Sequence, residues 1–196
     1  MDNDIINNII GKINNGRFYA SRYRAQLKNK TNPYISCFPS SVSNLLSKFD
    51  VEVSPDKIMS DCNLHSDLWR GINKIVRYEF RSKMYQLWQV EENIINYYLP
   101  KYQATQHYKL SLEALKQFVK FNPVIVNTTP KYHGKTLGHI MLIVGIVEDG
   151  FIIDDPFGDF RVNYATGHYK KGNDLFITFK EFEKIRGTMA ITIKER

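Results

Sequence analysis

The chain has 196 residues, of which 43% are hydrophobic and 13% aromatic, and this composition excludes a disordered chain. No apolar run approaches the roughly 20 residues that a membrane-spanning helix needs, so we expect no membrane span. The length suits one domain, and the net charge of +7 indicates attraction to polyanions without choosing among them.

The first residues are expected to form an N-terminal helical arm. Isoleucines recur at helical spacing between residues 4 and 14, so we assign residues 1–22 to this arm and residues 23–196 to a single globular domain. The acidic start, with asparagines between the isoleucines, does not fit a secretory signal. We therefore expect synthesis in the cytoplasm, with Cys37 and Cys62 as free thiols.

Helices are predicted mainly in the first half of the chain. From Pro39 onward, apolar residues recur at positions i, i+3, i+4 and i+7, which predicts a helix that has Cys37 at or just before its N-terminus. Further helices are predicted at residues 67–78, 90–98 and 112–121.

Strands are predicted over most of the second half, where short segments are rich in β-branched residues. They cover residues 124–127, 139–147, 151–154, 175–178 and 189–194. Asp149-Gly150 is typical of the turn of a hairpin. Helices followed mostly by strands predict an α+β fold, in which an N-terminal helical half packs on an antiparallel sheet.

Three residues that lie far apart in the sequence have the chemistry of a nucleophile, a base and an orienting acid. Cys37 lies at a helix N-terminus, where partial positive charge stabilises a thiolate. An imidazole completes such an activation, and an acceptor on its second nitrogen holds it in place. His139 and Asp155 fit these roles, because the predicted hairpin brings them to the same end. The pattern predicts a catalytic triad.

Two alternatives remain open from these residues alone. His139 would instead be a core histidine, with Asp155 a turn residue before Pro156. Asp154 also competes with Asp155 for the imidazole. Because neighbouring residues of a strand point to opposite faces, only one of the two carboxylates can contact His139.

Short motifs spread over residues 23–185 resemble one family. They are Gln26-Leu27-Lys28-Asn29, Asn32-Pro33-Tyr34, Cys37, Ser40-Ser41, Asn122-Pro123-Val124-Ile125-Val126, Gly138-His139, Gly145 and Asp155-Pro156-Phe157-Gly158. As a set they resemble the C39-like branch of the papain-like cysteine peptidases, particularly its phage and bacterial members. The resemblance implies a papain-like fold, a Cys37, His139 and Asp155 triad that hydrolyses amide bonds, and Gln26 as an oxyanion-hole donor beside the Cys37 amide.

The basic charge, the missing export signal and the likeness to phage-type members together predict a peptidoglycan hydrolase, released to the cell wall or carried in a virion. Its substrate would be a peptide or peptidoglycan, and anionic cell-wall polymers would bind its basic surface. One alternative is a protease that processes a leader or structural protein. Another is an inactive papain-fold protein that binds without cutting, as suggested by Phe38 after the cysteine, where many relatives have glycine, and by the 11 positions between Gln26 and Cys37.

Other signals are weaker. Cys62 and His65 have a C-x-x-H spacing, but no second pair follows, so we expect no metal and no cofactor. The aromatic and polar segment 158–171 is expected to form a wall of the cleft. A basic stripe on the predicted helix 67–78 and just beyond it would be a solvated face or a surface for an anionic polymer, and nucleic acid is not the expected partner. The stripe consists of Arg70, Lys74, Arg77 and Arg81.

Overall fold

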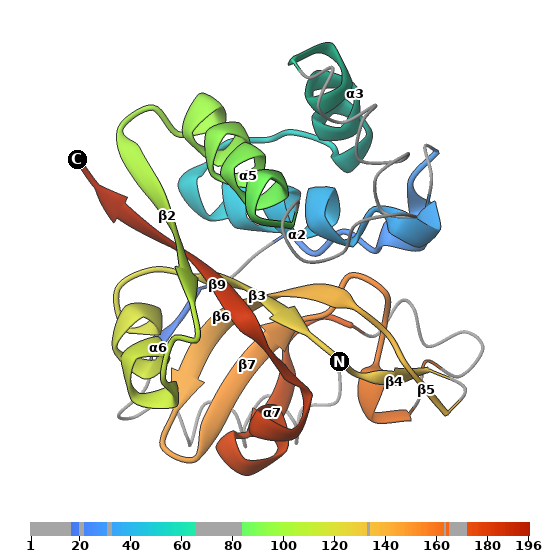
Figure 1. Ribbon diagram of the computed structural model, residues 1–196, viewed down its shortest axis with the longest axis vertical. Coiled ribbons are helices and arrows are strands. Elements are labelled where there is room, and N and C mark those ends of the chain that lie inside the picture. The colour runs from blue at the N-terminus through green and yellow to red at the C-terminus, as the bar shows by residue number, and fades with distance from the viewer. Residues whose placement is uncertain are drawn as a thin grey trace.

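A layer of helices lies on an antiparallel sheet in the computed structural model of the chain (Figure 1). The structure describes residues 17–19, 22–30, 33–65, 84–132, 134–162, 164 and 172–196. The predicted arm at residues 4–14 and the predicted helix at 67–78, with its basic stripe, lie outside these residues. Among the described helices, none is long and apolar enough to cross a membrane.

The sheet runs in the order β2-β9-β3-β6-β7-β8, and every neighbouring pair is antiparallel. Its strands are β2 (Tyr102–Tyr108), β3 (Val124–Thr128), β6 (His139–Val147), β7 (Gly150–Asp154), β8 (Leu175–Thr178) and β9 (Arg186–Glu195), and β1 (Arg17–Phe18) pairs with β6. A separate small hairpin consists of β4 (Lys131–Tyr132) and β5 (Lys135–Thr136). This hairpin lies in the connection between β3 and β6.

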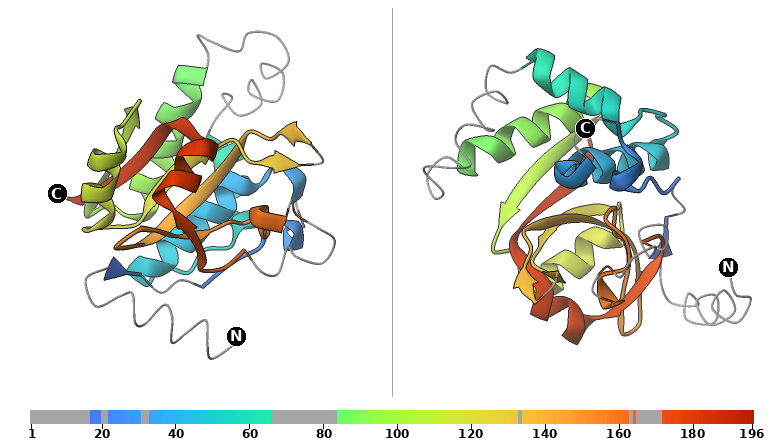
Figure 2. Two further views of the ribbon diagram at one scale, coloured as in Figure 1. Left: turned by 90° about the horizontal axis from the view of Figure 1, so that it is seen from below. Right: turned by 90° about the vertical axis from the view of Figure 1, so that its right-hand side faces the viewer.

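Helices cover both faces of the sheet, as the right-hand view of Figure 2 shows. On one face lie α2 (Cys37–Leu46), α3 (Pro55–His65) and α5 (Met84–Tyr98), and on the other lie α6 (Leu112–Val119) and α7 (Phe179–Ile185). The first group packs into one hydrophobic cluster with the sheet and the second group into another. The predicted α+β architecture, with helices from the N-terminal half on an antiparallel sheet, is confirmed.

The central strand β6 is buried at every position, because both of its faces are covered. Ile140, Leu142 and Val144 belong to the cluster on the α2 side, whereas Met141 and Ile143 belong to the cluster with α6 and α7. A strand covered on both faces needs apolar residues on both, which explains the long uninterrupted apolar run at this point of the sequence. The strand is therefore a rigid base for the residue at its start.

A β-bulge in β6 decides which aspartate shares a face with His139. One extra residue, Val144, interrupts the pairing with β7, and beyond it Leu142 lies opposite Asp154. Because directly opposite residues share a face, Asp154 points to the α2 side and Asp155 turns to the other side. The carboxylate of Asp155, and not that of Asp154, accepts from His139.

Several element boundaries differ from those predicted. The helix expected from Pro39 begins two residues earlier, at Cys37, and the helix expected at 90–98 begins at Met84. The strands expected in the second half are all present; those at 139–147 and 175–178 have the predicted bounds, and the other three are longer. We missed α3, α7 and β2 entirely, because the apolar spacing is weak in α3 and β2 and because α7 is only seven residues long.

Candidate active site

Cys37 is the first residue of α2 and carries a free, half-buried thiol. Its sulfur accepts hydrogen bonds from the backbone N–H groups of Phe38 and Ile140 and shares one with the imidazole of His139. Ser41, one turn further along the helix, donates its hydroxyl to the carbonyl of Ile140 over 3.3 Å. This contact fixes the start of α2 against the start of β6, so that the thiol and the imidazole meet.

The two groups stabilise each other as an ion pair. Burial alone would raise the pKa of the Cys37 thiol, but the hydrogen bond and charge of His139, together with the two backbone amides, bring the pKa below its ordinary value. Burial alone would lower the pKa of His139, but the charge and hydrogen bond of Asp155, with the contact to Cys37, raise it to about 10. A thiolate beside an imidazolium is the reactive form of a cysteine nucleophile.

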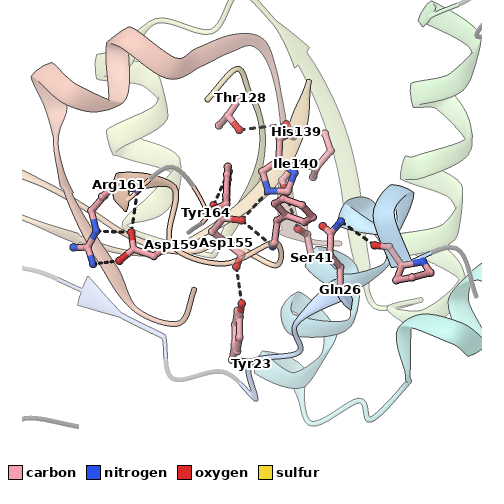
Figure 3. A network of polar contacts seen from close by, with 12 residues as sticks. Tyr23, Gln26, Ser41, Thr128, His139, Ile140, Asp155, Asp159, Arg161 and Tyr164 are labelled. Carbon is pink, nitrogen blue, oxygen red and sulfur yellow. Dashed lines mark hydrogen bonds and ion pairs between the residues drawn. The ribbon is translucent and has the colours of Figure 1, made fainter. Parts of the chain in front are cut away.

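Asp155 holds the imidazole from the far side. His139 Nε2 donates to Asp155 Oδ1 over 2.7 Å, and the two side chains are 3% and 0% exposed (Figure 3). The same Oδ1 accepts from the backbone N–H of Phe157 over 2.9 Å, and Oδ2 accepts from the hydroxyl of Tyr164 over 3.0 Å. Three donors therefore stabilise the carboxylate and fix its plane.

The backbone of Asp155 is fixed as well. Its carbonyl accepts from the hydroxyl of Tyr23 over 2.7 Å, and its N–H donates to the carbonyl of Gly172 over 2.7 Å. A Cβ atom at Gly172 would lie 1.9 Å from the carbonyl oxygen of Asp155, so only glycine allows this approach. Both the side chain and the main chain of Asp155 are thus tied to segments distant in sequence.

Gln26 lies between the two halves of the site, although 11 positions separate it from Cys37. Its backbone N–H donates to the carbonyl of Pro156 over 2.7 Å, and its side-chain Nε2 donates to the carbonyl of Pro33 over 2.9 Å. That carbonyl also accepts from the hydroxyl of Ser36, the residue before Cys37. The side chain is 1% exposed, and its Nε2 carries a second N–H beyond the one given to Pro33.

Aromatic rings surround His139. The ring centroids of Phe157 and Tyr164 each lie 6.2 Å from that of the imidazole, with the rings tilted steeply to it. Tyr132, from the small β4-β5 hairpin, packs against both at 5.6 and 5.9 Å. The segment expected to form a wall of the cleft thus contributes a described residue, Tyr164, beside the imidazole. These rings leave little room around the imidazole.

Variants of Tyr23 and Tyr164 test the role of Asp155. The hydroxyl of Tyr23 donates to the backbone carbonyl of Asp155, whereas the hydroxyl of Tyr164 donates to its carboxylate. In Tyr164→Phe the carboxylate loses a donor and becomes more basic, so the pKa of His139 should rise above about 10. We expect Tyr23→Phe to leave that pKa unchanged. Titration of the imidazole by NMR measures both. A fall of the pKa in Tyr164→Phe, or an equal change in the two variants, would contradict this role.

The structure thus brings Cys37, His139 and Asp155 into contact, and it ties Gln26 to Pro156, the residue after Asp155, and to Pro33. We did not select Tyr23 from the sequence, because a lone tyrosine 14 positions before the cysteine carries no signal of its contact. Among the residues that the structure describes, no group of three His, Cys, Asp or Glu side chains could hold a metal ion. The side chains of Cys62 and His65 lie outside the described part.

Solved structures show where this fold occurs. A double glycine motif protease from an AMS/PCAT transporter, crystallised with its leader peptide, has a TM-score of 0.57 and 14% identity, over 91% of this chain and 94% of that one. A putative C39-like peptidase from Bacillus anthracis has a TM-score of 0.55 and 15% identity, over 88% and 94%. The peptidase domain of Streptococcus ComA, a bifunctional ABC transporter, has a TM-score of 0.51 and 13% identity, over 89% and 100%.

No curated protein matches the chain. The sequence profile of the Peptidase_C39 like family, however, matches residues 19–185, which is most of its length and includes all four site residues. This match agrees with the papain-like arrangement of the helices and the sheet. The chain therefore belongs to the Peptidase C39-like family of cysteine peptidases.

Proposed function

We propose that the protein is a processing peptidase that cuts a polypeptide with Cys37 as its nucleophile. The observation that carries the proposal is the continuous contact from the Cys37 thiol through the His139 imidazole to the Asp155 carboxylate. Each member is held by other elements of the fold, so the three groups are ordered before any substrate arrives. Such pre-organisation is what covalent catalysis by a thiol requires.

The proposed reaction begins when Cys37 Sγ attacks the carbonyl carbon of the scissile peptide bond. Negative charge develops on the carbonyl oxygen, and the backbone N–H of Cys37 with the second N–H of Gln26 would stabilise it. His139 gives its proton to the leaving amine, which breaks the C–N bond and leaves an acyl-enzyme. A water molecule then gives a proton to His139 and attacks the acyl carbon, which releases the acid and restores the thiolate.

Two observations support a polypeptide with small residues at the cut as the substrate. The rings of Phe157 and Tyr164 crowd His139, which is itself 3% exposed, so a scissile bond flanked by small side chains would fit best. One protein of similar fold is a double glycine motif protease bound to a leader peptide. These observations favour processing over the peptidoglycan hydrolysis that we expected from charge and motif, which remains the second candidate because of the net charge of +7.

A peptide series tests the proposal. We expect cleavage after Gly-Gly in an extended peptide, and at least about tenfold lower kcat/KM when valine replaces the glycine before the cut, because the isopropyl side chain would clash with the rings. Purified cell walls are assayed beside the peptides, with Cys37→Ala as the blank in both. Lysis of cell walls without cleavage of any peptide would overturn the processing role in favour of peptidoglycan hydrolysis.

A further inference from the structure

Glu91 of α5 is a buried carboxyl group that the proposed triad does not use. Its side chain is 8% exposed, and its Oε2 is completely buried without a hydrogen-bond partner among the described residues. A buried polar atom without a partner is costly, and most such atoms in folded proteins have one. An exception next to a catalytic centre calls for a partner that arrives from outside.

Glu91 lies near Cys37. Ile95 and Leu99 follow it on the same helical face and pack with Phe38 of α2 in one hydrophobic cluster. Cys37 itself packs against the same cluster, and α5 and α2 lie on the same side of the sheet (Figure 2). Burial raises the pKa of Glu91 well above its ordinary value, and the negative charge of Cys37 raises it further. The shared cluster and the electrostatic coupling thus agree that the carboxyl lies on the Cys37 side of α5.

The neighbouring Glu92 shows how a carboxylate on this helix is used for structure. It is only half-buried, and it accepts a hydrogen bond from the backbone N–H of Gln106 in β2. This contact joins α5 to the edge of the sheet. Glu91 has no comparable contact for its Oε2 in the described part of the chain. The two residues differ in environment but are of the same type and neighbours on the same helix.

We infer that Glu91 is a subsite for a cationic amine of the substrate, such as a lysine side chain close to the scissile bond. The inference rests on the proposed peptidase function and names a feature of its substrate. An ammonium group provides both the missing donors and the opposite charge, which a neutral donor does not. On binding, the carboxyl group releases its proton to water and the ammonium keeps its own, so the buried pair is neutral overall.

A peptide panel tests the subsite. In a peptide that the enzyme cuts, each of the positions flanking the scissile bond is replaced in turn by lysine, norleucine or glutamate. At one position we expect lysine to exceed norleucine by at least about tenfold in kcat/KM, because truncating one partner of a buried charged pair typically costs more than this. Glu91→Gln should remove the preference and leave the norleucine rate nearly unchanged, while Glu92→Gln should keep the preference.

A second measurement does not depend on turnover. In a Cys62→Ser background, Cys37 is labelled with cationic aminoethyl methanethiosulfonate or with neutral methyl methanethiosulfonate. The ratio of the two rates should fall in Glu91→Gln but not in Glu92→Gln. Glu91→Met should fold with unchanged or higher thermal stability, because it removes the unpartnered carboxyl and keeps an apolar stem.

The outcomes separate the two proposals. If peptides are cut with no preference for lysine at any position, or if the preference survives in Glu91→Gln, the amine subsite is wrong and the peptidase stands. If neither reagent labels Cys37 faster than an ordinary thiol and no peptide is cut, the proposed function itself falls. A charge-dependent labelling ratio that Glu91→Gln abolishes supports the subsite even before a substrate is found.

Discussion

Cys37→Ala is expected to lower peptide cleavage by at least about 10⁴-fold, because removing the nucleophile of a catalytic triad leaves only what binding and the oxyanion hole supply. The fold should survive, since the thiol is half-buried at the first position of α2 and alanine fits there. Cys62→Ser serves as the control for the loss of a thiol and should retain activity. Cleavage assays with circular dichroism on the same samples separate a catalytic loss from an unfolded protein.

The same thiol should show its activation without a substrate. The pKa of Cys37 lies below its ordinary value and that of His139 is about 10, so the thiolate and imidazolium coexist between these two limits. Alkylation by iodoacetamide should therefore be fast well below pH 8, and cleavage should fall as the pH rises through about 10, where the imidazolium loses the proton needed by the leaving amine. His139→Ala should return alkylation to the profile of an ordinary thiol near pH 8.5.

Slow alkylation of the wild type that rises only near the ordinary thiol pKa, and that His139→Ala does not change, would contradict the ion pair. It would favour the alternative that the chain binds without cutting. Phe38, the departure from the family pattern that suggested this alternative, is a buried member of the core cluster and its N–H donates to the Cys37 sulfur. The side chain of Phe38 thus packs in the core, while its backbone N–H stabilises the Cys37 thiolate.

The predicted helices are those with long, regular apolar faces, whereas α3 and α7, which were missed, could have been found from the capping signals at their starts. For α7, Thr178 and Glu181 form a reciprocal capping box that is readable as T-x-x-E. For α3, Ser54 accepts from the backbone N–H of Lys57 and Pro55 occupies the first helical position. These signals were present, but the apolar spacing that we relied on is weak in α3, and α7 is only seven residues long.

The edge strand β2 was not predictable in the same way. Only Ala104 of its seven residues is fully buried, so an alternating apolar pattern is missing from the sequence. The strand forms because β9 offers it a complete antiparallel ladder, from Tyr102 opposite Glu195 to Tyr108 opposite Met189. Such pairing depends on the rest of the sheet and not on the segment itself.

The candidate site likewise contains residues that could be predicted from the sequence and residues that could not. Cys37, His139 and Asp155 were predictable because each has a chemistry that catalysis needs and the hairpin implied that two of them meet. Strand alternation could not choose between Asp154 and Asp155, because the choice depends on the bulge at Val144, which is a feature of the folded pairing. The contacts of Tyr23 and Tyr164 with Asp155 and the burial of Glu91 come from tertiary packing. Their local sequence does not predict them, although the segment that contains Tyr164 was expected to lie at the cleft.

The two aspartates are also the sharpest test of the triad, because both are completely buried and only one contacts His139. Asp155→Ala should cost about 3–5 kcal/mol in the free energy of unfolding, as expected when one partner of a buried ion pair is removed, and at least about 10³-fold in kcat. Asp154→Ala should also destabilise the protein, because Asp154 accepts from the backbone N–H of Asp174 and its charge acts on Lys48. Its effect on kcat should be small, since His139 bonds to Asp155 and Asp154 accepts from the backbone of Asp174 instead.

Asp155→Asn separates the charge of the carboxylate from its geometry. The asparagine oxygen can still accept from Phe157 and from His139 Nε2, so the ring should stay in place. The negative charge is lost, and with it the main cause that raises the pKa of His139 to about 10. The falling limb of the pH profile of kcat should therefore move to lower pH, and kcat at neutral pH should drop less than in Asp155→Ala. If Asp155→Asn left the limb in place while Asp154→Asn moved it, the orienting role would belong to Asp154 instead.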